Sequence, residues 1–284
     1  MAFTFQKIVP HGTSNPIVAR LTLQIFKILE NCEISEETRE KIIELYLNSL
    51  QKKLLRCWEI KERFRQEFNR VVETFKPQSG QAVEVPQIDR LDEECHNYLY
   101  EAKNYIRDLL QVVNVLYGTD FEEASEFSRA KKGGQSLIDF AEQKFGPQDA
   151  KTEFIKEARG VEEIIAFRNA VEHPGGYSGR LIIKNFSLNP GGTLTEPGWH
   201  REKDEKPVTA LSPIRVDMDT IVSNLLTLGE DIIVSWAADN LKSKEMMRVA
   251  VVPEEQRDPT CAIKYVVTAS HKLEEQLKAL TGMK

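Results

Sequence analysis

The sequence has few cysteines and no arrangement of them that is typical of a metal site. Its four cysteines (Cys32, Cys57, Cys95 and Cys261) are far apart, and none belongs to a CxxC pair. This spacing argues against structural zinc and indicates free, partly buried thiols. We therefore expect neither a bound metal nor another cofactor.

Signals for export or membrane insertion are also missing. The first seven residues lack the basic start and apolar core of a signal peptide. No apolar run approaches the ~20 residues that a helix needs to cross a bilayer. The expected location is the cytoplasm, and no contact with a membrane is expected.

Basic charge is not in excess. The net charge of −6 argues against a protein that coats nucleic acid through a generally basic surface. It leaves room for a local basic groove. With 284 residues, of which 41% are hydrophobic and 29% charged, the chain can form one large domain or two smaller ones with an ample core.

The N-terminal region, residues 1–85, is predicted to be helical. Asn15-Pro16 is typical of a helix start, and Ser35 followed by two glutamates predicts another. No glycine or proline then appears before Pro77, so a helix of about 40 residues is expected. Its heptad seam would pack against a helix of the same chain or, alternatively, against a second chain. The seam consists of Ile43, Leu47, Leu50, Leu54, Cys57, Lys61 as its polar member, Phe64, Phe68, Val71 and Phe75.

A second region, residues 86–175, follows a predicted linker at 77–86. Apolar residues at helical spacing predict a long helix from Asp89 to Tyr117, which Gly118 ends. Three further helices are expected at 120–131, 135–145 and about 150–173.

The third region, residues 176–284, is predicted to mix strands with helices. The run 181–188 predicts a strand, and the turn Asn189-Pro190-Gly191-Gly192 leads to a return strand that begins near 193–195. The expected fold class is α+β, predominantly α, with a small C-terminal β hairpin and helix region. The remaining expected elements are a charged loop at 201–206, a helix from Asp217 or Asp219 to about Leu241, strands near 247–252 and 262–268, and a C-terminal helix from about Ser270.

The best functional lead is the end of the helix near residue 173. Arg168 and His173 form an R-x4-H pair, with Asn169 directly after the arginine. The spacing alone arises easily by chance, but cations are favoured in the last turns of a helix, and Pro174 favours its end just after the histidine. On a straight helix the side chains of Arg168 and His173 would point about 140° apart. They converge only if His173 leaves the helical path or if two chains each supply one pair.

Residues 86–175 resemble a HEPN domain, a bundle of four or five helices whose ribonuclease members carry R-x4-6-H near the end of a late helix. The run from Arg168 to His173 fits that form, and residues 97–102 (Asn-Tyr-Leu-Tyr-Glu-Ala) are similar to the family's first long helix. The resemblance implies a metal-independent endoribonuclease of the toxin or phage-defence kind, which acts on RNA as a homodimer and has an antitoxin or other regulatory protein as partner. Two alternatives stay open: an inactive nucleic-acid or nucleotide-binding module, and a helical interaction scaffold.

The resemblance implies that three motif residues carry the catalysis. His173 would move protons at the 2′-hydroxyl or the leaving oxygen, and Arg168 would stabilise the charge on phosphorus. Asn169 would position a phosphate oxygen or the imidazole of His173.

The residues around this motif are further candidates. A carboxylate that holds Arg168 is expected on the facing helix, from Glu101 or Glu94; a salt bridge to Glu172 on the same helix is the alternative. Trp199 and His200 lie in a turn-rich stretch and are expected to form a recognition lip or exposed hairpin decoration. The side chains expected to contact RNA are Tyr177, Arg180, Lys184, Arg129, Lys131 and Lys132.

Overall fold

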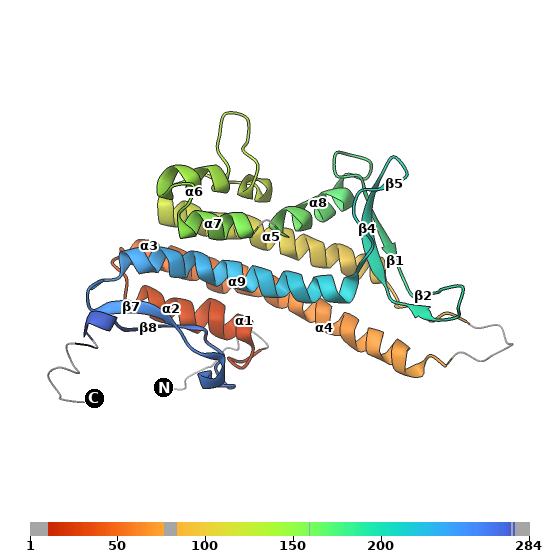
Figure 1. The fold of residues 1–284 in the computed structure, drawn as a ribbon, viewed down its shortest axis with the longest axis horizontal. Helices are drawn as coiled ribbons and strands as arrows, with labels where there is room; N and C mark the ends of the chain where they lie inside the picture. The colour runs from red at the N-terminus through yellow and green to blue at the C-terminus, as the bar shows by residue number, and fades with distance from the viewer. Residues whose placement is uncertain (1–10, 77–83, 159, 274, 276–284) are drawn as a thin grey trace, which may run out of the picture. The chain divides into compact units, whose positions relative to one another are not determined.

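The computed structural model describes residues 11–76, 84–158, 160–273 and 275 (Figure 1). Helices hold 58% and strands 14% of the residues, which confirms the predominantly helical α+β class. Most of the predicted linker at 77–86 lies outside the described residues. The chain divides into two compact units, each assembled from separate segments. Unit 1 is Met1–Lys52, Asp108–Phe121 and Leu226–Lys284, and unit 2 is Lys53–Arg107 and Glu122–Leu225.

Unit 1 begins with the two predicted helix starts, and both are confirmed. The Asn15 side chain accepts the N–H of Ile17, and the Ser35 side chain accepts that of Thr38. The helical path after Ser35 runs without a break to Thr74, as predicted. The elements are α1 (Pro16–Val18), the π-helix η1 (Ala19–Gln24) and α2 (Ile25–Leu29), then α3 (Glu36–Glu44), the π-helix η2 (Leu45–Leu50) and α4 (Gln51–Thr74), of which all but the first two residues belong to unit 2.

The buried face at the start of this long helix differs from the predicted seam. Ile42 and Tyr46 are fully buried, whereas Ile43 and Leu47 are only half-buried. The π-helix η2 has wider turns than an α-helix, so it shifts the buried face by about one residue. From Leu50, the last residue of η2, onward, the predicted positions Leu50, Leu54, Cys57, Phe64 and Val71 are buried.

A β hairpin completes unit 1, close to where two strands were predicted. Strand β7 (Met247–Val251) pairs antiparallel with β8 (Tyr265–Ala269). The Gln24 side-chain oxygen on η1 accepts the N–H groups of Lys264 and Tyr265, both at 2.7 Å, so the helix holds the hairpin. Residues 274 and 276–284 of the predicted C-terminal helix lie outside the described part of the chain.

In unit 2 the helices α4, α5 (Leu91–Tyr117) and α9 (Ile214–Asn240) pack together. The Tyr98 hydroxyl on α5 donates to the carbonyl of Met218 at 2.8 Å, and the Tyr105 hydroxyl donates to that of Leu225 at 2.9 Å. From α4, the Cys57 thiol lies 3.7 Å from the carbonyl oxygen of Tyr98. The seam of α4 therefore packs against helices of its own chain.

Helix α9 is apolar enough to raise the question of a membrane. By length and composition it is the one helix among the described residues that could span a bilayer. However, 56% of its most apolar window is buried inside the fold, which is typical of the core helix of a soluble protein. Glu230 and Asp231 interrupt its apolar residues, which is why the sequence shows no long apolar run there.

Two predicted helices differ in extent from the structure. The stretch 120–131 holds only the short 3-10 helix η3 (Ala124–Phe127), which Glu123 and Glu126 cap reciprocally. The helix predicted over 150–173 is two helices, α7 (Ala150–Glu157) and α8 (Gly160–Glu172), because the backbone of Ala158 leaves the helical region with ψ at 14°. The helix α6 (Leu137–Phe145) is confirmed, with Ser136 as its cap and Gly146 at its end.

A small sheet follows α8 in unit 2. The predicted charged loop at 201–206 is wrong in extent, because only Asp204 and Glu205 form a turn: the residues before them continue the strand β4 (Gly198–Lys203) and the residue after them begins β5 (Lys206–Pro207). The expectation that Trp199 and His200 are exposed is also wrong: both are buried, and the Trp199 indole donates to Asp217 at 2.5 Å. β4 pairs with β1 (Arg180–Lys184), β5 and β6 (Ser212–Pro213), while β2 (Ser187–Leu188) pairs with β3 (Leu194–Thr195) across the predicted turn.

Candidate functional site

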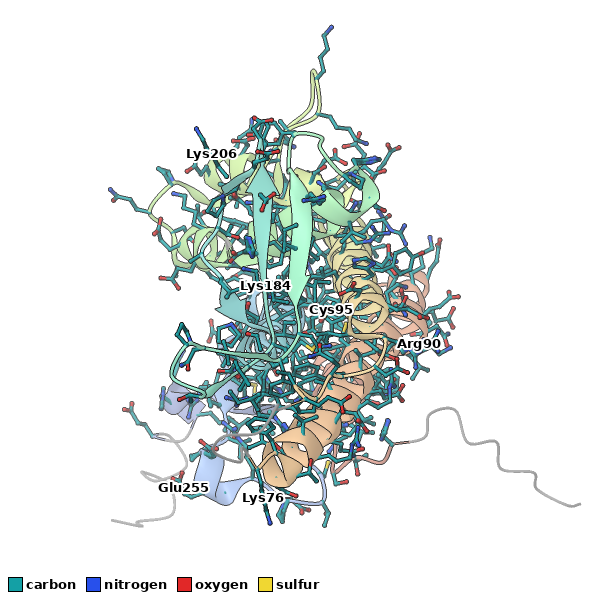
Figure 2. All side chains as sticks on the ribbon, turned by 90° about the vertical axis from the view of Figure 1, so that its right-hand side faces the viewer. Lys76, Arg90, Cys95, Lys184, Lys206 and Glu255 are labelled. Carbon is teal, nitrogen blue, oxygen red and sulfur yellow. The ribbon has the colours of Figure 1, made fainter. Side chains whose placement is uncertain are left out.

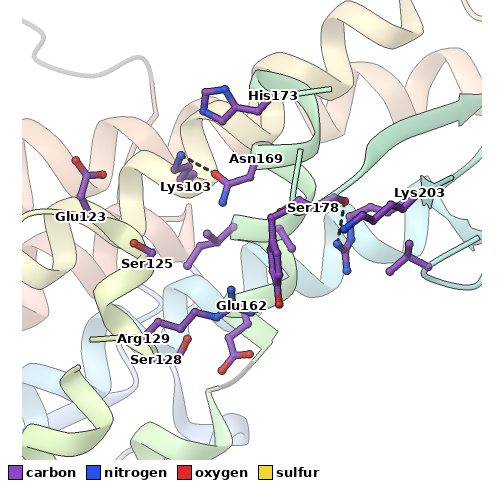
Figure 3. A pocket seen from close by; sticks show the side chains of 15 residues that line it. Lys103, Glu123, Ser125, Ser128, Arg129, Glu162, Asn169, His173, Ser178 and Lys203 are labelled. Carbon is purple, nitrogen blue, oxygen red and sulfur yellow. Dashed lines mark hydrogen bonds between the residues drawn. The ribbon is translucent and has the colours of Figure 1, made fainter. Parts of the chain in front are cut away.

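A pocket of about 680 Å³ opens in unit 2 beside the C-terminal end of α8 (Figure 3). Helix α5, the segment around η3, α8, the turn after α8 and β4 all contribute to its lining. Its charged side chains are four cations, Lys103, Arg129, Arg201 and Lys203, and two carboxylates, Glu123 and Glu162. The pocket is therefore locally basic although the chain as a whole is acidic.

Helix α8 places two of the three motif residues in this pocket. Asn169 and His173 are four residues apart, share one helix face and both line the pocket. The N–H of His173 donates to the carbonyl of Asn169 at 2.9 Å, so the backbone stays helical up to the histidine. The chain then turns at Pro174 and Gly175, and His173 remains exposed.

The third motif residue, Arg168, is absent from the pocket lining. Its guanidinium pairs with Glu172 at 2.9 Å and lies over the ring of Tyr100, 5.2 Å from the centroid. The Arg168 side chain is only 13% exposed, and its Nε has no hydrogen-bond partner among the described residues. Within one chain, therefore, only Asn169 and His173 of the motif reach the pocket.

Lys103 on α5 connects the pocket to the Arg168 ion pair. Its Nζ lies 3.0 Å from Oδ1 of Asn169 and 2.8 Å from Oε2 of Glu172. Burial raises the pKa of Glu172, but the hydrogen bond from Lys103 and the charges of Lys103 and Arg168 outweigh it and hold that pKa below its ordinary value. Glu172 is therefore ionised at neutral pH and restrains both cations.

A tight turn places Tyr177 at the rim of the pocket. The N–H of Gly179 donates to the carbonyl of Gly176 at 3.0 Å, which closes a turn with Tyr177 at its tip. The glycine at 179 is required, because its φ is +77° and a Cβ there would lie 2.3 Å from the carbonyl oxygen of Glu202. The guanidinium of Arg129 lies 5.3 Å from the centroid of the Tyr177 ring, and the ammonium of Lys203 lies 5.6 Å from it.

Only some of the residues predicted to contact RNA lie in the pocket. Tyr177 and Arg129 line the pocket, and four other candidates do not. Lys131 pairs with Glu122 at 2.6 Å, and Arg180 pairs with Glu202 at 3.4 Å. Lys132 is exposed in a turn five residues after the end of η3. Lys184 lies at the opposite end of the strands from Lys206 and the neighbouring Lys203 (Figure 2).

The carboxylate that holds Arg168 is Glu172, which was the alternative considered from the sequence. Glu94 pairs instead with Arg63 on α4 at 2.7 Å. The charge of Glu101, together with the larger effect of burial, raises the pKa of the Cys57 thiol on α4.

Three cations of the pocket are not found by reasoning from the sequence. Arg201 and Lys203 alternate along β4 and so share one face of the strand, a signal that is visible only once 198–203 is recognised as a strand. Lys103 carries no local signal, since it is one of many charged residues on α5.

The described residues contain no group of three or more His, Cys, Asp or Glu side chains that could hold a metal ion. What the pocket does offer is an exposed imidazole and an amide beside four cations. Such a set can bind a phosphate ester and move a proton at it. Comparison with protein-family models, with curated proteins and with solved structures found no match to this chain.

Proposed function

We propose that this chain is a metal-independent endoribonuclease with a HEPN-like helical bundle, acting on RNA as a homodimer. One observation carries the proposal: Asn169 and the exposed His173 line a pocket that holds four cationic side chains. Each linkage of RNA carries one negative charge, which Lys and Arg side chains attract. The R-x4-H pair at the end of α8 supports the resemblance to the HEPN family.

The proposed reaction is an internal transfer at phosphorus. The 2′-oxygen attacks phosphorus, the bond between phosphorus and the 5′-oxygen breaks, and the products are a 2′,3′-cyclic phosphate and a 5′-hydroxyl. His173 accepts the proton from the 2′-hydroxyl, and an acid supplies one to the leaving 5′-oxygen. Lys103 and Arg201 would stabilise the additional negative charge that develops on the phosphate oxygens.

A second copy of the chain completes this chemistry. His173 is the one histidine among the described residues that line the pocket, while the reaction needs both a base and an acid. Arg168 is held outside the pocket by Glu172. A symmetric partner would bring a second His173 to the scissile phosphate as the acid, which is why the proposal includes a homodimer; Arg168 would act only after release from Glu172.

The test is incubation of the full chain with single-stranded RNA in excess chelator. We expect fragments with cyclic phosphate and 5′-hydroxyl ends, and a loss of rate of at least ~100-fold in His173→Ala. His271→Ala removes an exposed histidine outside the pocket and serves as the matched control, with an unchanged rate. Cleavage that requires added metal, or that survives in His173→Ala, would contradict the proposal.

A non-catalytic RNA- or nucleotide-binding module is the second candidate. The ion pair between Arg168 and Glu172 favours it, because the arginine that would serve catalysis is neutralised within its own helix. Binding of intact RNA that weakens in Arg201→Ala, without cleavage by the wild type at any protein concentration that gives dimers in sedimentation, would support this second function.

A further inference from the structure

Tyr177 lines the pocket but has no role in the proposed cleavage chemistry. Tyr177 is 80% exposed, the largest value among the exposed large hydrophobic residues that the structure describes. Its backbone, in contrast, is fixed. The turn is closed by the hydrogen bond from Gly179 to Gly176, and the Ser178 carbonyl accepts a hydrogen bond from the Arg201 guanidinium at 3.1 Å. A rigid backbone thus presents an accessible aromatic face.

The surroundings of the ring are cationic. Arg129 comes from the segment after η3, and Lys203 comes from the end of β4, so two separate elements place a cation at the same ring. Each cation lies within the distance of a cation–π contact, yet the ring remains mostly accessible. The rim of the pocket therefore joins a flat apolar surface to two positive charges.

We infer that the pocket takes an unpaired nucleotide of single-stranded RNA, with its base stacked on Tyr177 and its neighbouring phosphates bound by Arg129 and Lys203. This inference rests on the proposed function for the identity of the ligand as RNA, and it adds the class of RNA. A nucleotide combines a planar π system with an anion, which matches an aromatic ring beside two cations. An acidic peptide would use the cations and leave the ring without a partner.

The accessibility of the base faces favours single-stranded over duplex RNA as the ligand of this pocket. In a duplex both faces of a base are covered by its neighbours, so a side chain can stack on it only after the base is unstacked. An unpaired base offers its face without that cost. Because hydrogen bonds hold the backbone of the turn that carries Tyr177, little backbone entropy is lost when the base stacks on its ring.

The experiment measures binding separately from cleavage. All variants carry His173→Ala, and the probe is a fluorescein-labelled oligouridylate, free or annealed to oligoadenylate, followed by anisotropy in chelator. Stacking of one base on an aromatic side chain corresponds to a loss of roughly tenfold in affinity when the ring is removed. We expect that loss for the single strand in Tyr177→Ala and also in Tyr177→Leu, which keeps an apolar side chain but has no ring.

Two control variants should leave the affinity for the single strand unchanged. Tyr177→Phe keeps the ring and should bind as the parent does, and Val72→Ala removes an apolar side chain that is 48% exposed on α4, outside the pocket. The inference is overturned if Tyr177→Ala binds the single strand as tightly as the parent, or if the annealed probe binds equally well. If the binding pattern holds while wild-type protein cleaves no RNA, only the proposed nuclease function fails. Cleavage by the wild type with no effect of Tyr177 on binding would remove only this inference.

Discussion

Arg168 and Lys103 share one carboxylate, since the two oxygens of Glu172 lie 2.9 Å from the first and 2.8 Å from the second. One cation comes from α8 and the other from α5, so Glu172 joins the two helices at the edge of the pocket. Glu172 also occupies the position of an anion between two cations. A phosphate that enters the pocket therefore competes with an internal carboxylate for Lys103.

Replacing Glu172 by glutamine should increase the affinity for RNA. Removal of one negative charge frees Lys103 and Arg168, and a unit charge about 4 Å away in water is worth about 1 kcal/mol, or roughly fivefold in affinity. Anisotropy in the His173→Ala background should show this gain at low salt and a smaller gain at high salt. Glu67→Gln, which removes an exposed carboxylate paired with Arg70 on α4, is the matched control. A fall in affinity in Glu172→Gln would mean that Glu172 positions Lys103 for the ligand.

The same carboxylate predicts a pH dependence of stability. The pKa of Glu172 in the folded chain lies below its ordinary value of 4.5. A group with a depressed folded pKa contributes stability that is fully present above its unfolded pKa and is lost as the pH falls through the folded one. The difference in unfolding free energy between the wild type and Glu172→Gln should therefore be constant above about pH 5 and shrink below it. Urea titrations at several pH values measure this difference, and a difference that does not change with pH would contradict the assignment.

Local rules predict the helix ends of this fold well. Asn15 and Ser35 cap helices where expected, because a side-chain oxygen two or three residues before a free N–H satisfies it whatever the tertiary structure. The π-helix η2 was not predictable in this way. Because its turns are wider, Ile42 is buried in place of the predicted Ile43. Whether a π-helix forms there depends on what the helix packs against.

The site is predicted only in part, for a related reason. Asn169 and His173 are four residues apart on one helix, so their common face follows from the sequence. Lys103, Arg201 and Lys203 join them from α5 and β4, which are distant in sequence. Trp199 shows the same limit, because a tryptophan beside turn residues was expected on the surface and is instead fully buried against Phe167, with ring centroids 5.5 Å apart.

In the turn that carries Tyr177, replacing Gly179 by alanine should cost more stability than replacing Gly175 by alanine. Gly175 and Gly179 both have positive φ, but a Cβ at Gly175 meets nothing within 4 Å, whereas one at Gly179 meets the carbonyl oxygen of Glu202 at 2.3 Å. Gly175→Ala should cost about 1 kcal/mol of stability, from backbone strain alone. Gly179→Ala should cost about 2 kcal/mol more, because the strands must shift to remove the clash. Equal losses in urea denaturation of the two variants would show that the turn does not approach β4 this closely.

Two ion pairs of unit 1 have the same N–O distance but differ in burial, so they allow the effect of burial on their contribution to stability to be measured. Glu230 and Lys264 lie 3.0 Å apart with the Glu230 side chain fully buried, and Glu245 and Lys272 lie 3.0 Å apart with both side chains mostly exposed. Glu230 also accepts hydrogen bonds from Arg20 at 2.8 Å and from Gln24 at 3.0 Å.

Removal of Glu230 leaves the partly buried Arg20 without its carboxylate and leaves Lys264 with only Asp231, at 3.6 Å, so Glu230→Ala should lower the free energy of unfolding by about 3–5 kcal/mol. Glu245→Ala should change it by no more than about 0.5 kcal/mol, because water already screens the exposed pair. Urea denaturation of both variants, followed by circular dichroism, gives the comparison. If the two substitutions cost the same, the carboxylate of Glu230 does not hold the C-terminal hairpin on η1 and α9 as its hydrogen bonds indicate.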